Sequence, residues 1–104
     1  TLPLAGFYQG VRRTALAAGE LLREIRVPAL GGRRRGLFLK LGLRRAQAIS
    51  VVNVAVVVAF AGDGPDAPVR EARIALGCVA PTVVRAAAAE QFLVGRALDA
   101  AACA

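Results

Sequence analysis

Two apolar segments joined by a glycine-rich turn constrain the fold of this chain more than any other feature. Residues 51–60 consist almost entirely of Val and Ala, a composition typical of a strand that is covered on both faces. Gly62-Asp63-Gly64-Pro65-Asp66 supplies the residue types that tight turns need. Residues 69–79 follow, and polar and apolar side chains alternate along most of them. The pattern predicts a long antiparallel β-hairpin.

The apolar stretch from residue 49 to residue 61 is also the best candidate for a membrane span. It contains Ser50 and Asn53, and it is much shorter than the about 20 apolar residues that a spanning helix needs. We therefore expect no membrane insertion.

Two segments upstream of the hairpin alternate in the manner of strands. Residues 37–43 place leucines on one face, with Phe38 and Lys40 on the other. Residues 20–27 alternate as well, with Arg23 as the exception among inward-facing side chains, and Pro28 ends that run. Together with the hairpin, these segments predict an antiparallel sheet of about four strands.

Helices are expected after the sheet. Pro81 interrupts the strand pattern, and Thr82 is placed to cap a helix over residues 85–94, which Gly95 ends. A second helix begins at residue 97 and reaches residue 104 with no complete buried face. The predicted fold class is therefore α+β: an antiparallel sheet followed by C-terminal helices.

The chain has 104 residues, of which 57% are hydrophobic and 20% charged, so we expect one globular domain over residues 1–104. It begins at Thr1 and has no Met. We interpret it as a fragment of a longer protein.

Positive charge is concentrated in the first half of the chain. Residues 1–45 contain ten basic and two acidic residues, whereas the remainder contains four basic and five acidic ones, which together give the net charge of +7. An anionic partner is one explanation. The other is high-GC coding, because all but one of the basic residues are Arg.

The loop with three consecutive arginines, at 33–35, could grip phosphate or could simply be solvated. Nucleic-acid-binding surfaces usually interleave aromatic and basic residues so that bases can stack. Phe38 is the only aromatic residue in the densest basic region, so nucleic-acid binding stays a weak alternative.

Residues for catalysis or metal binding are scarce. The chain has no His, and its two cysteines, Cys78 and Cys103, are not spaced as a CxxC pair. Glu20 and Glu24 share a strand face, as expected of exposed, ion-paired side chains. No glycine-rich phosphate-binding motif opens a helix. We expect no catalytic residue and no metal site, and Cys78 to be a small core residue.

The join between the second predicted strand and the Val-rich segment is the most suggestive place for a ligand. Lys40 and then Arg44-Arg45 stand directly before that segment. They place positive charge at the mouth of a strand, where an anionic or electron-rich group could bind. A solvated strand end is the alternative.

Six segments in order resemble one family, the C-terminal domain of the FAD-binding (medium) subunit of molybdenum hydroxylases. Xanthine dehydrogenase and aerobic carbon monoxide dehydrogenase belong to this family. The segments are GVRRTAL at 10–16, GELLREIRVP at 19–28, KLGLRRAQAIS at 40–50, ARIALG at 72–77, VAP at 79–81, and scattered matches from Arg85 to Gly95.

The resemblance implies part of an oxidoreductase with FAD as its flavin, held mostly by a larger domain that precedes Thr1. It also implies a cytoplasmic enzyme in which a large subunit carries the molybdenum cofactor and a small subunit carries [2Fe–2S] clusters. Electrons would pass through those clusters to FAD and then to an external acceptor. Further helical turns are expected after Ala104, and the isolated fragment is expected to be inactive.

Three residues match flavin-site positions of the family. Leu22 matches the residue that packs on the isoalloxazine ring, Lys40 a lysine near the polar edge of the ring, and Arg12 an arginine near the flavin and the acceptor pocket. One departure is Cys78, which stands where a second glycine often follows Gly77. A non-catalytic subunit-docking module is the main alternative function.

Overall fold

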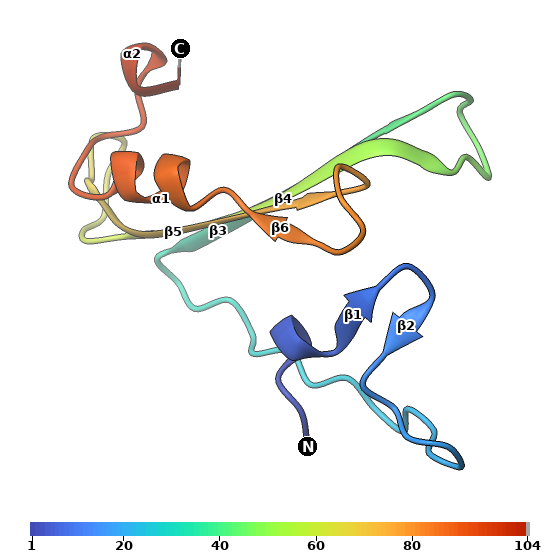
Figure 1. The fold of residues 1–104 in the computed structure, drawn as a ribbon. Helices are drawn as coiled ribbons and strands as arrows, with labels where there is room; N and C mark the ends of the chain where they lie inside the picture. Colours follow the sequence, from blue (N-terminus) through green and yellow to red (C-terminus); the bar gives the residue numbers. More distant parts are fainter. Residues whose placement is uncertain (104) are drawn as a thin grey trace.

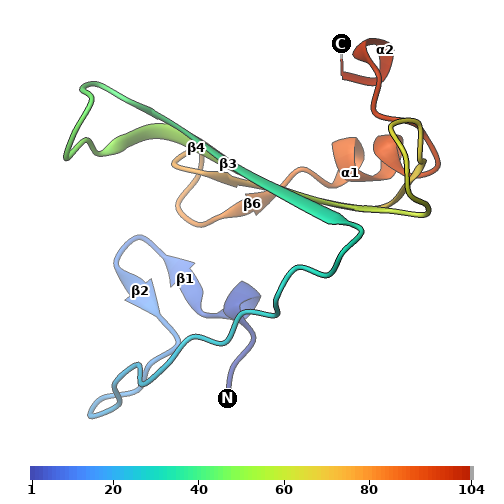
Figure 2. The same ribbon diagram turned by 180° about the vertical axis from the view of Figure 1, so that it is seen from behind.

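The structure, a computed structural model, describes residues 1–103 and consists of two parts (Figures 1 and 2). The larger part is a four-stranded antiparallel sheet in the order β3-β4-β5-β6 with one packed helix; we call it the sheet body. The smaller part, residues 1–33, holds a two-stranded hairpin and is called the N-terminal segment. Within the N-terminal segment, an extended stretch of chain leads from the hairpin to the sheet body.

The long hairpin predicted from the sequence is the centre of the sheet body. Strand β4 (Ser50–Phe60) pairs with β5 (Val69–Gly77) on one side and with β3 (Arg34–Gly42) on the other. Leucines of β3 lie opposite valines of β4, as in Leu37 with Val56 and Leu39 with Val54. Because facing residues of neighbouring strands share a face, this register gathers the branched side chains on one side of the sheet.

The core of the sheet body lies where helix α1 (Ala87–Leu93) packs on the β4–β5 end of the sheet. Val58, Val69 and Ala72 are buried there, and Leu93 packs against them. The backbone N–H of Gly95 donates to the carbonyl of Val69 over 2.8 Å. Gly95 has φ +82° and ends the helix, as the sequence predicted.

The prediction that Thr82 caps the helix is wrong. The helix begins at Ala87 after the N-cap residue Ala86, whose side chain makes no capping hydrogen bond. The chain before it forms strand β6 (Val84–Arg85), which pairs with β5. Edge pairing therefore takes the residues that the sequence pattern assigned to the first helical turn. Helix α2 (Ala100–Cys103) also begins later than the predicted residue 97.

Glu90 fastens α1 to the sheet. Its Oε1 accepts a hydrogen bond from the backbone N–H of Ile74 over 2.7 Å, and its carboxylate pairs with both Arg85 Nε and Arg85 Nη2. The Arg85 guanidinium, followed by the Ile74 N–H, lowers the pKa of Glu90. The side chain of Glu90 is only 14% exposed, so one carboxylate ties together β5, β6 and α1.

The predicted strand at residues 20–27 does not form. Backbone groups of residues 21–30 have no backbone hydrogen-bond partner in the described chain, because β3 pairs only with β4. The fourth strand of the sheet is instead β6. The N-terminal segment also contains elements that the sequence pattern missed: the short 3-10 helix η1 (Leu4–Gly6) and the β1 (Tyr8–Gly10) and β2 (Arg13–Thr14) hairpin.

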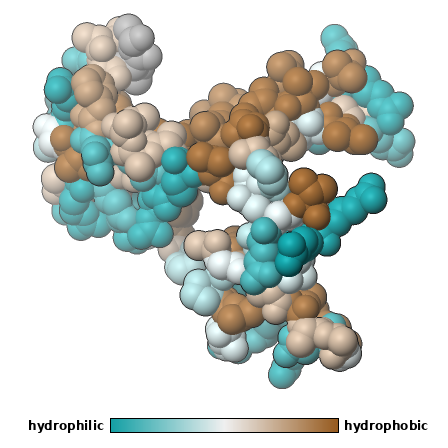
Figure 3. Space-filling view, viewed as in Figure 1, coloured by the Kyte–Doolittle hydropathy of each residue, from teal (hydrophilic) through white to brown (hydrophobic). Residues whose placement is uncertain are grey.

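The sheet is not covered on both faces by this chain, contrary to the expectation for β4. Only Val58 and Ala59 of that strand are buried. The accessible surface is 8480 Å², against about 5,500 Å² for a compact monomer of this mass. The radius of gyration is 16.4 Å, against about 13 Å. Figure 3 shows apolar side chains exposed along the β3–β4 arm.

Candidate functional site

An open cavity with a volume of about 660 Å³ lies within the N-terminal segment. Residues from Thr1 to Tyr8 form one wall, and residues 20–26 form much of the other. Phe7 and Tyr8 stack edge to face with centroids 5.1 Å apart. Leu22, the first of the three predicted site residues, lines this cavity and is 51% exposed. An exposed leucine beside aromatic rings offers an apolar surface to a flat ligand.

Lys40, the second predicted site residue, lies near the distal end of β3. It is directly opposite Asn53 of β4, while its neighbours Leu39 and Leu41 pair with valines. Because successive residues of a strand point to opposite faces, Lys40 points away from the leucine face, as predicted. Its Nζ donates a 2.6 Å hydrogen bond to the carbonyl of Ala48, so the ammonium also anchors the loop that follows β3.

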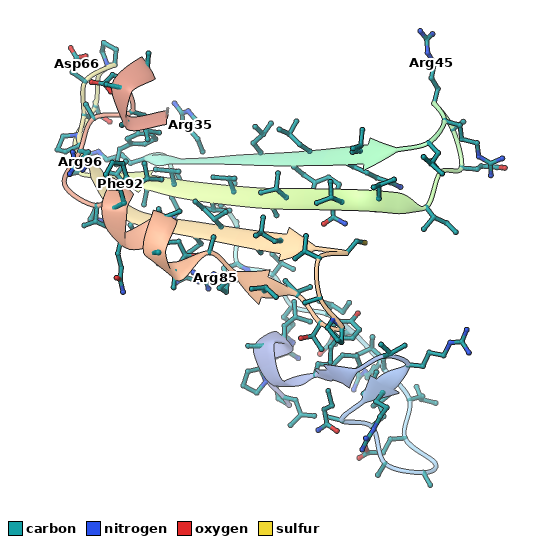
Figure 4. All side chains as sticks on the ribbon, turned by 45° about the horizontal axis from the view of Figure 1, so that its top comes forward. Arg35, Arg45, Asp66, Arg85, Phe92 and Arg96 are labelled. Atoms are coloured by element: carbon teal, nitrogen blue, oxygen red, sulfur yellow. The ribbon has the colours of Figure 1, made fainter. Side chains whose placement is uncertain are left out.

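The loop after β3 is fixed by more than Lys40. Arg44 donates through Nε and Nη2 to the carbonyl of Gln47, at 3.3 and 2.8 Å. A Cβ added at Gly42 would come within 2.7 Å of the Ala48 Cβ, so the loop folds tightly onto the strand end. Arg45 extends from the tip of this arm, at the opposite end of the sheet from Arg96 (Figure 4). Arg44 is therefore a loop anchor.

Arg12, the third predicted site residue, occupies the turn between β1 and β2. It has φ +55°, a left-handed conformation that is uncommon for a residue with a side chain. The turn is preceded by a register shift between Tyr8 and Gly10. Neither Arg12 nor Lys40 lines the cavity that contains Leu22. The chain therefore presents the three predicted residues on three separate elements.

The residues in register with Lys40 across the sheet, Asn53 and Gly77, were not predicted from the sequence to belong to the site. Asn53 lies opposite both Lys40 and Gly77, and its Nδ2 donates to Cys78 Sγ over 3.6 Å. A Cβ at Gly77 would overlap the Asn53 side chain, so only glycine leaves room for that amide. A lone Asn inside a Val- and Ala-rich strand was the available signal.

Cys78 is exposed and has φ +65°, so the expectation of a core cysteine is wrong. The strand ends at Gly77, one residue before the position where the alternating pattern would have buried the thiol. The left-handed conformation is one that glycine adopts without strain. This explains in physical terms why glycine would suit the position.

The arginine-rich loop is largely satisfied within the chain. Arg33 forms a two-point ion pair with Asp63, with Nε to Oδ1 at 3.1 Å and Nη2 to Oδ2 at 2.9 Å. The pair lowers the pKa of Asp63. Arg35 donates to the carbonyls of Gly32 and Arg34. Two of the three arginines thus have partners within the chain before any phosphate is present. This weakens the hypothesis that the loop binds nucleic acid.

Within the described residues there is no group of three or more His, Cys, Asp and Glu side chains that could hold a metal ion. The same part of the chain has no helix long and apolar enough to cross a membrane.

The chain is similar to known proteins at the level of family, sequence and structure. The model of the CO dehydrogenase flavoprotein C-terminal domain matches residues 38–104. Nicotinate hydroxylase of Emericella nidulans is 35% identical over 98 residues, which cover 92% of this chain and 7% of that protein. The carbon monoxide dehydrogenase medium chain of Hydrogenophaga pseudoflava is 35% identical over 97 residues, covering 93% of this chain and 32% of that one.

A solved structure of carbon monoxide dehydrogenase from Hydrogenophaga pseudoflava, which lacks the Mo-pyranopterin moiety of the molybdenum cofactor, is similar to this chain. The TM-score is 0.77 at 38% identity, covering 94% of this chain and 32% of that one. The chain thus spans a third or less of the length of these relatives. The resemblance and the fold class drawn from the sequence are confirmed, and the chain belongs to the CO dehydrogenase flavoprotein C-terminal domain family of molybdenum hydroxylases.

Proposed function

We propose that this chain is the FAD-proximal domain of the flavoprotein subunit of a cytoplasmic molybdenum hydroxylase. It helps to position FAD for electron transfer from [2Fe–2S] clusters to an external acceptor. The observation that carries the proposal is the family match over residues 38–104, together with the structural likeness to carbon monoxide dehydrogenase at 38% identity.

Two of the predicted site residues offer the kinds of contact that a flavin ring needs. Leu22 supplies exposed apolar surface beside an open cavity, and Lys40 supplies a positive charge. An ammonium has three N–H donors, and the contact with Ala48 uses one of them, so Lys40 can donate to a ligand without releasing the loop. FAD, when bound, supplies the capacity to accept and release electrons. A fixed cation beside its ring raises its reduction potential, because it favours added negative charge.

Most of the FAD would be held outside this chain, by a preceding FAD-binding domain. We propose a small iron–sulfur subunit and a large molybdenum-binding subunit as the partners. One relative is a medium chain of carbon monoxide dehydrogenase, which fits such a multi-subunit assembly. The isolated 104-residue chain should be inactive and bind FAD weakly, because Leu22 lines an open cavity that neither Lys40 nor Arg12 lines.

The test is a lysine replacement in the intact flavoprotein subunit. Lys40→Met keeps the length of the side chain and removes its charge, so the flavin reduction potential should become more negative. Arg45→Met is the matched control, since it removes a positive charge from the tip of the same arm and should leave the potential unchanged. An unchanged potential and flavin absorbance spectrum in Lys40→Met would contradict the role of Lys40.

A subunit-docking role is the second candidate, and one observation favours it. Leu37, Leu39 and Leu41 form a row on β3 and are 56–60% exposed. Water-exposed leucines in a row are typical of a surface that another chain covers. Leu39→Asp in the intact subunit should abolish pull-down of the iron–sulfur or molybdenum subunit while leaving the flavin spectrum intact. Loss of flavin with retained pull-down would reject docking in favour of the flavin role.

A further inference from the structure

We propose that residues 21–27 form a β-strand that pairs with an edge strand of the flavin-binding domain of the same subunit. The proposal rests on the proposed function, because that function supplies the neighbouring domain. It accounts for a conflict between sequence and structure, since this segment has a strand pattern and yet pairs with no strand of the described chain.

The segment already has the side-chain arrangement of a strand. The Arg26 guanidinium donates to Glu24 Oε1, with Nε at 2.9 Å. In an extended chain, residues two apart lie on the same side. In β5, Arg73 Nε makes the same two-residue contact with Glu71 Oε1 over 2.6 Å. The matching contact in β5 supports an extended backbone at residues 24–26.

The segment has no neighbouring strand in the described chain. Its backbone N–H and C=O groups have no backbone partner among the described residues, and such groups are almost always paired in folded domains unless water reaches them. Its apolar side chains are equally open: Leu21 is 80% exposed, Ile25 62% and Val27 79%. A sheet edge alongside the segment would satisfy the backbone and cover part of this surface.

The position of the segment in the family identifies the occupant. The matched domain model begins at residue 38, so residues 21–27 lie outside the domain that folds as the sheet body. The chain covers only 32% of the carbon monoxide dehydrogenase medium chain. A second copy of this chain is a poorer partner, because each copy carries a net charge of +7 and two such copies repel one another.

Amide hydrogen exchange tests the pairing directly. In the full 104-residue chain, residues 21–27 should exchange as fast as the Gly62–Asp66 turn, which is the unprotected control. In the intact flavoprotein subunit, alternate amides of 21–27 should be slowed by about 100-fold or more, because every second N–H of an added strand donates to its neighbour. Fast exchange in both proteins would overturn the proposal.

Proline substitutions give a second readout in the intact subunit. Arg23→Pro, Glu24→Pro and Ile25→Pro should lower the melting temperature in alternation, because proline removes an N–H that matters only where it faces the partner strand. Equal effects at all three positions, or none, would count against a single added strand. Concentration-dependent protection in the 104-residue chain would mean self-association and would also overturn it.

These outcomes separate the strand from the flavin role. Protected amides in a subunit whose flavin is insensitive to Lys40→Met would retain the strand and reject the role of Lys40. A sensitive flavin beside unprotected amides would do the reverse.

Discussion

The sheet body and the N-terminal segment both alternate apolar and polar residues, but only the sheet body buries any of its apolar side chains. Val69 in β5 is 1% exposed, whereas Leu21 in the N-terminal segment is 80% exposed. The difference follows from pairing. Strand β4 has a neighbour on each side, whereas residues 21–30 have none in this chain. Alternation specifies a strand only where another strand supplies hydrogen bonds.

The sheet body and the N-terminal segment also differ in the kind of apolar surface that they expose. In the sheet body, the leucines of β3 are held by a full register with β4. In the N-terminal segment, the exposed side chains have no such frame. The leucine surface of β3 is already ordered, so a partner can bind it without further folding. The apolar side chains of the N-terminal segment need a partner strand before their backbone can form a regular strand.

The largest expected effect separates the two parts by stability. Val69→Ala should lower the free energy of unfolding of the 104-residue chain by about 2 kcal/mol, because it leaves a cavity in the core. Leu21→Ala should change it by less than about 0.5 kcal/mol, because that side chain is already in water. Urea denaturation followed by circular dichroism measures both. Equal losses would contradict the exposed position of Leu21.

A steric test within the sheet body comes next. Gly77→Ala should cost about 1–2 kcal/mol, because the new methyl group overlaps the Asn53 amide. Asn53→Ala in the same chain should restore part of the loss. Gly62→Ala is the control, since its Cβ would meet Ala67 Cβ at an ordinary 3.9 Å. If the double variant is as unstable as the two single losses added, the overlap is not the cause.

Two left-handed residues, one in each part, give a smaller contrast. Cys78→Gly should stabilise the sheet body by about 0.5–1 kcal/mol, because glycine adopts a positive φ without strain. Arg12→Gly relieves the same strain in the N-terminal hairpin and should leave unfolding of the sheet body unchanged. Thermal denaturation of the two variants measures both changes in stability. A gain from Arg12→Gly equal to that from Cys78→Gly would remove the contrast.

The loss of stability at low pH should come from the sheet body. The pKa of Glu90 is lowered from its ordinary value of 4.5 by Arg85 and the Ile74 N–H. A lowered folded-state pKa gives stability that is complete above the unfolded-state value and is lost as pH falls through the folded-state value. Glu90→Gln should therefore flatten the fall in melting temperature below about pH 4.5. Asp66→Asn, which removes a carboxylate from the exposed turn, should leave that fall unchanged.

The sequence predicted the parts of the site that depend on strand alternation. Lys40 faces away from the leucines because position within a strand fixes its side. It could not predict that Lys40 would donate to Ala48, since that contact depends on how the loop closes. Asn53 was missed because its importance lies in its register with Gly77 across the sheet. Register is a relation between strands, and no single segment contains it.

The sequence by itself determined the β4–β5 hairpin, the turn between its strands, the end of α1 just before Gly95 and the family. These depend on local residue types and on order along the chain. Tertiary structure alone decided that Val84 and Arg85 extend the sheet instead of beginning a helix, and that residues 20–27 do not form a strand here. The physical reason is the same in both cases. Backbone hydrogen bonds between strands need a neighbour at the right edge; β5 offers one to β6, and no strand of the described chain offers one to residues 20–27.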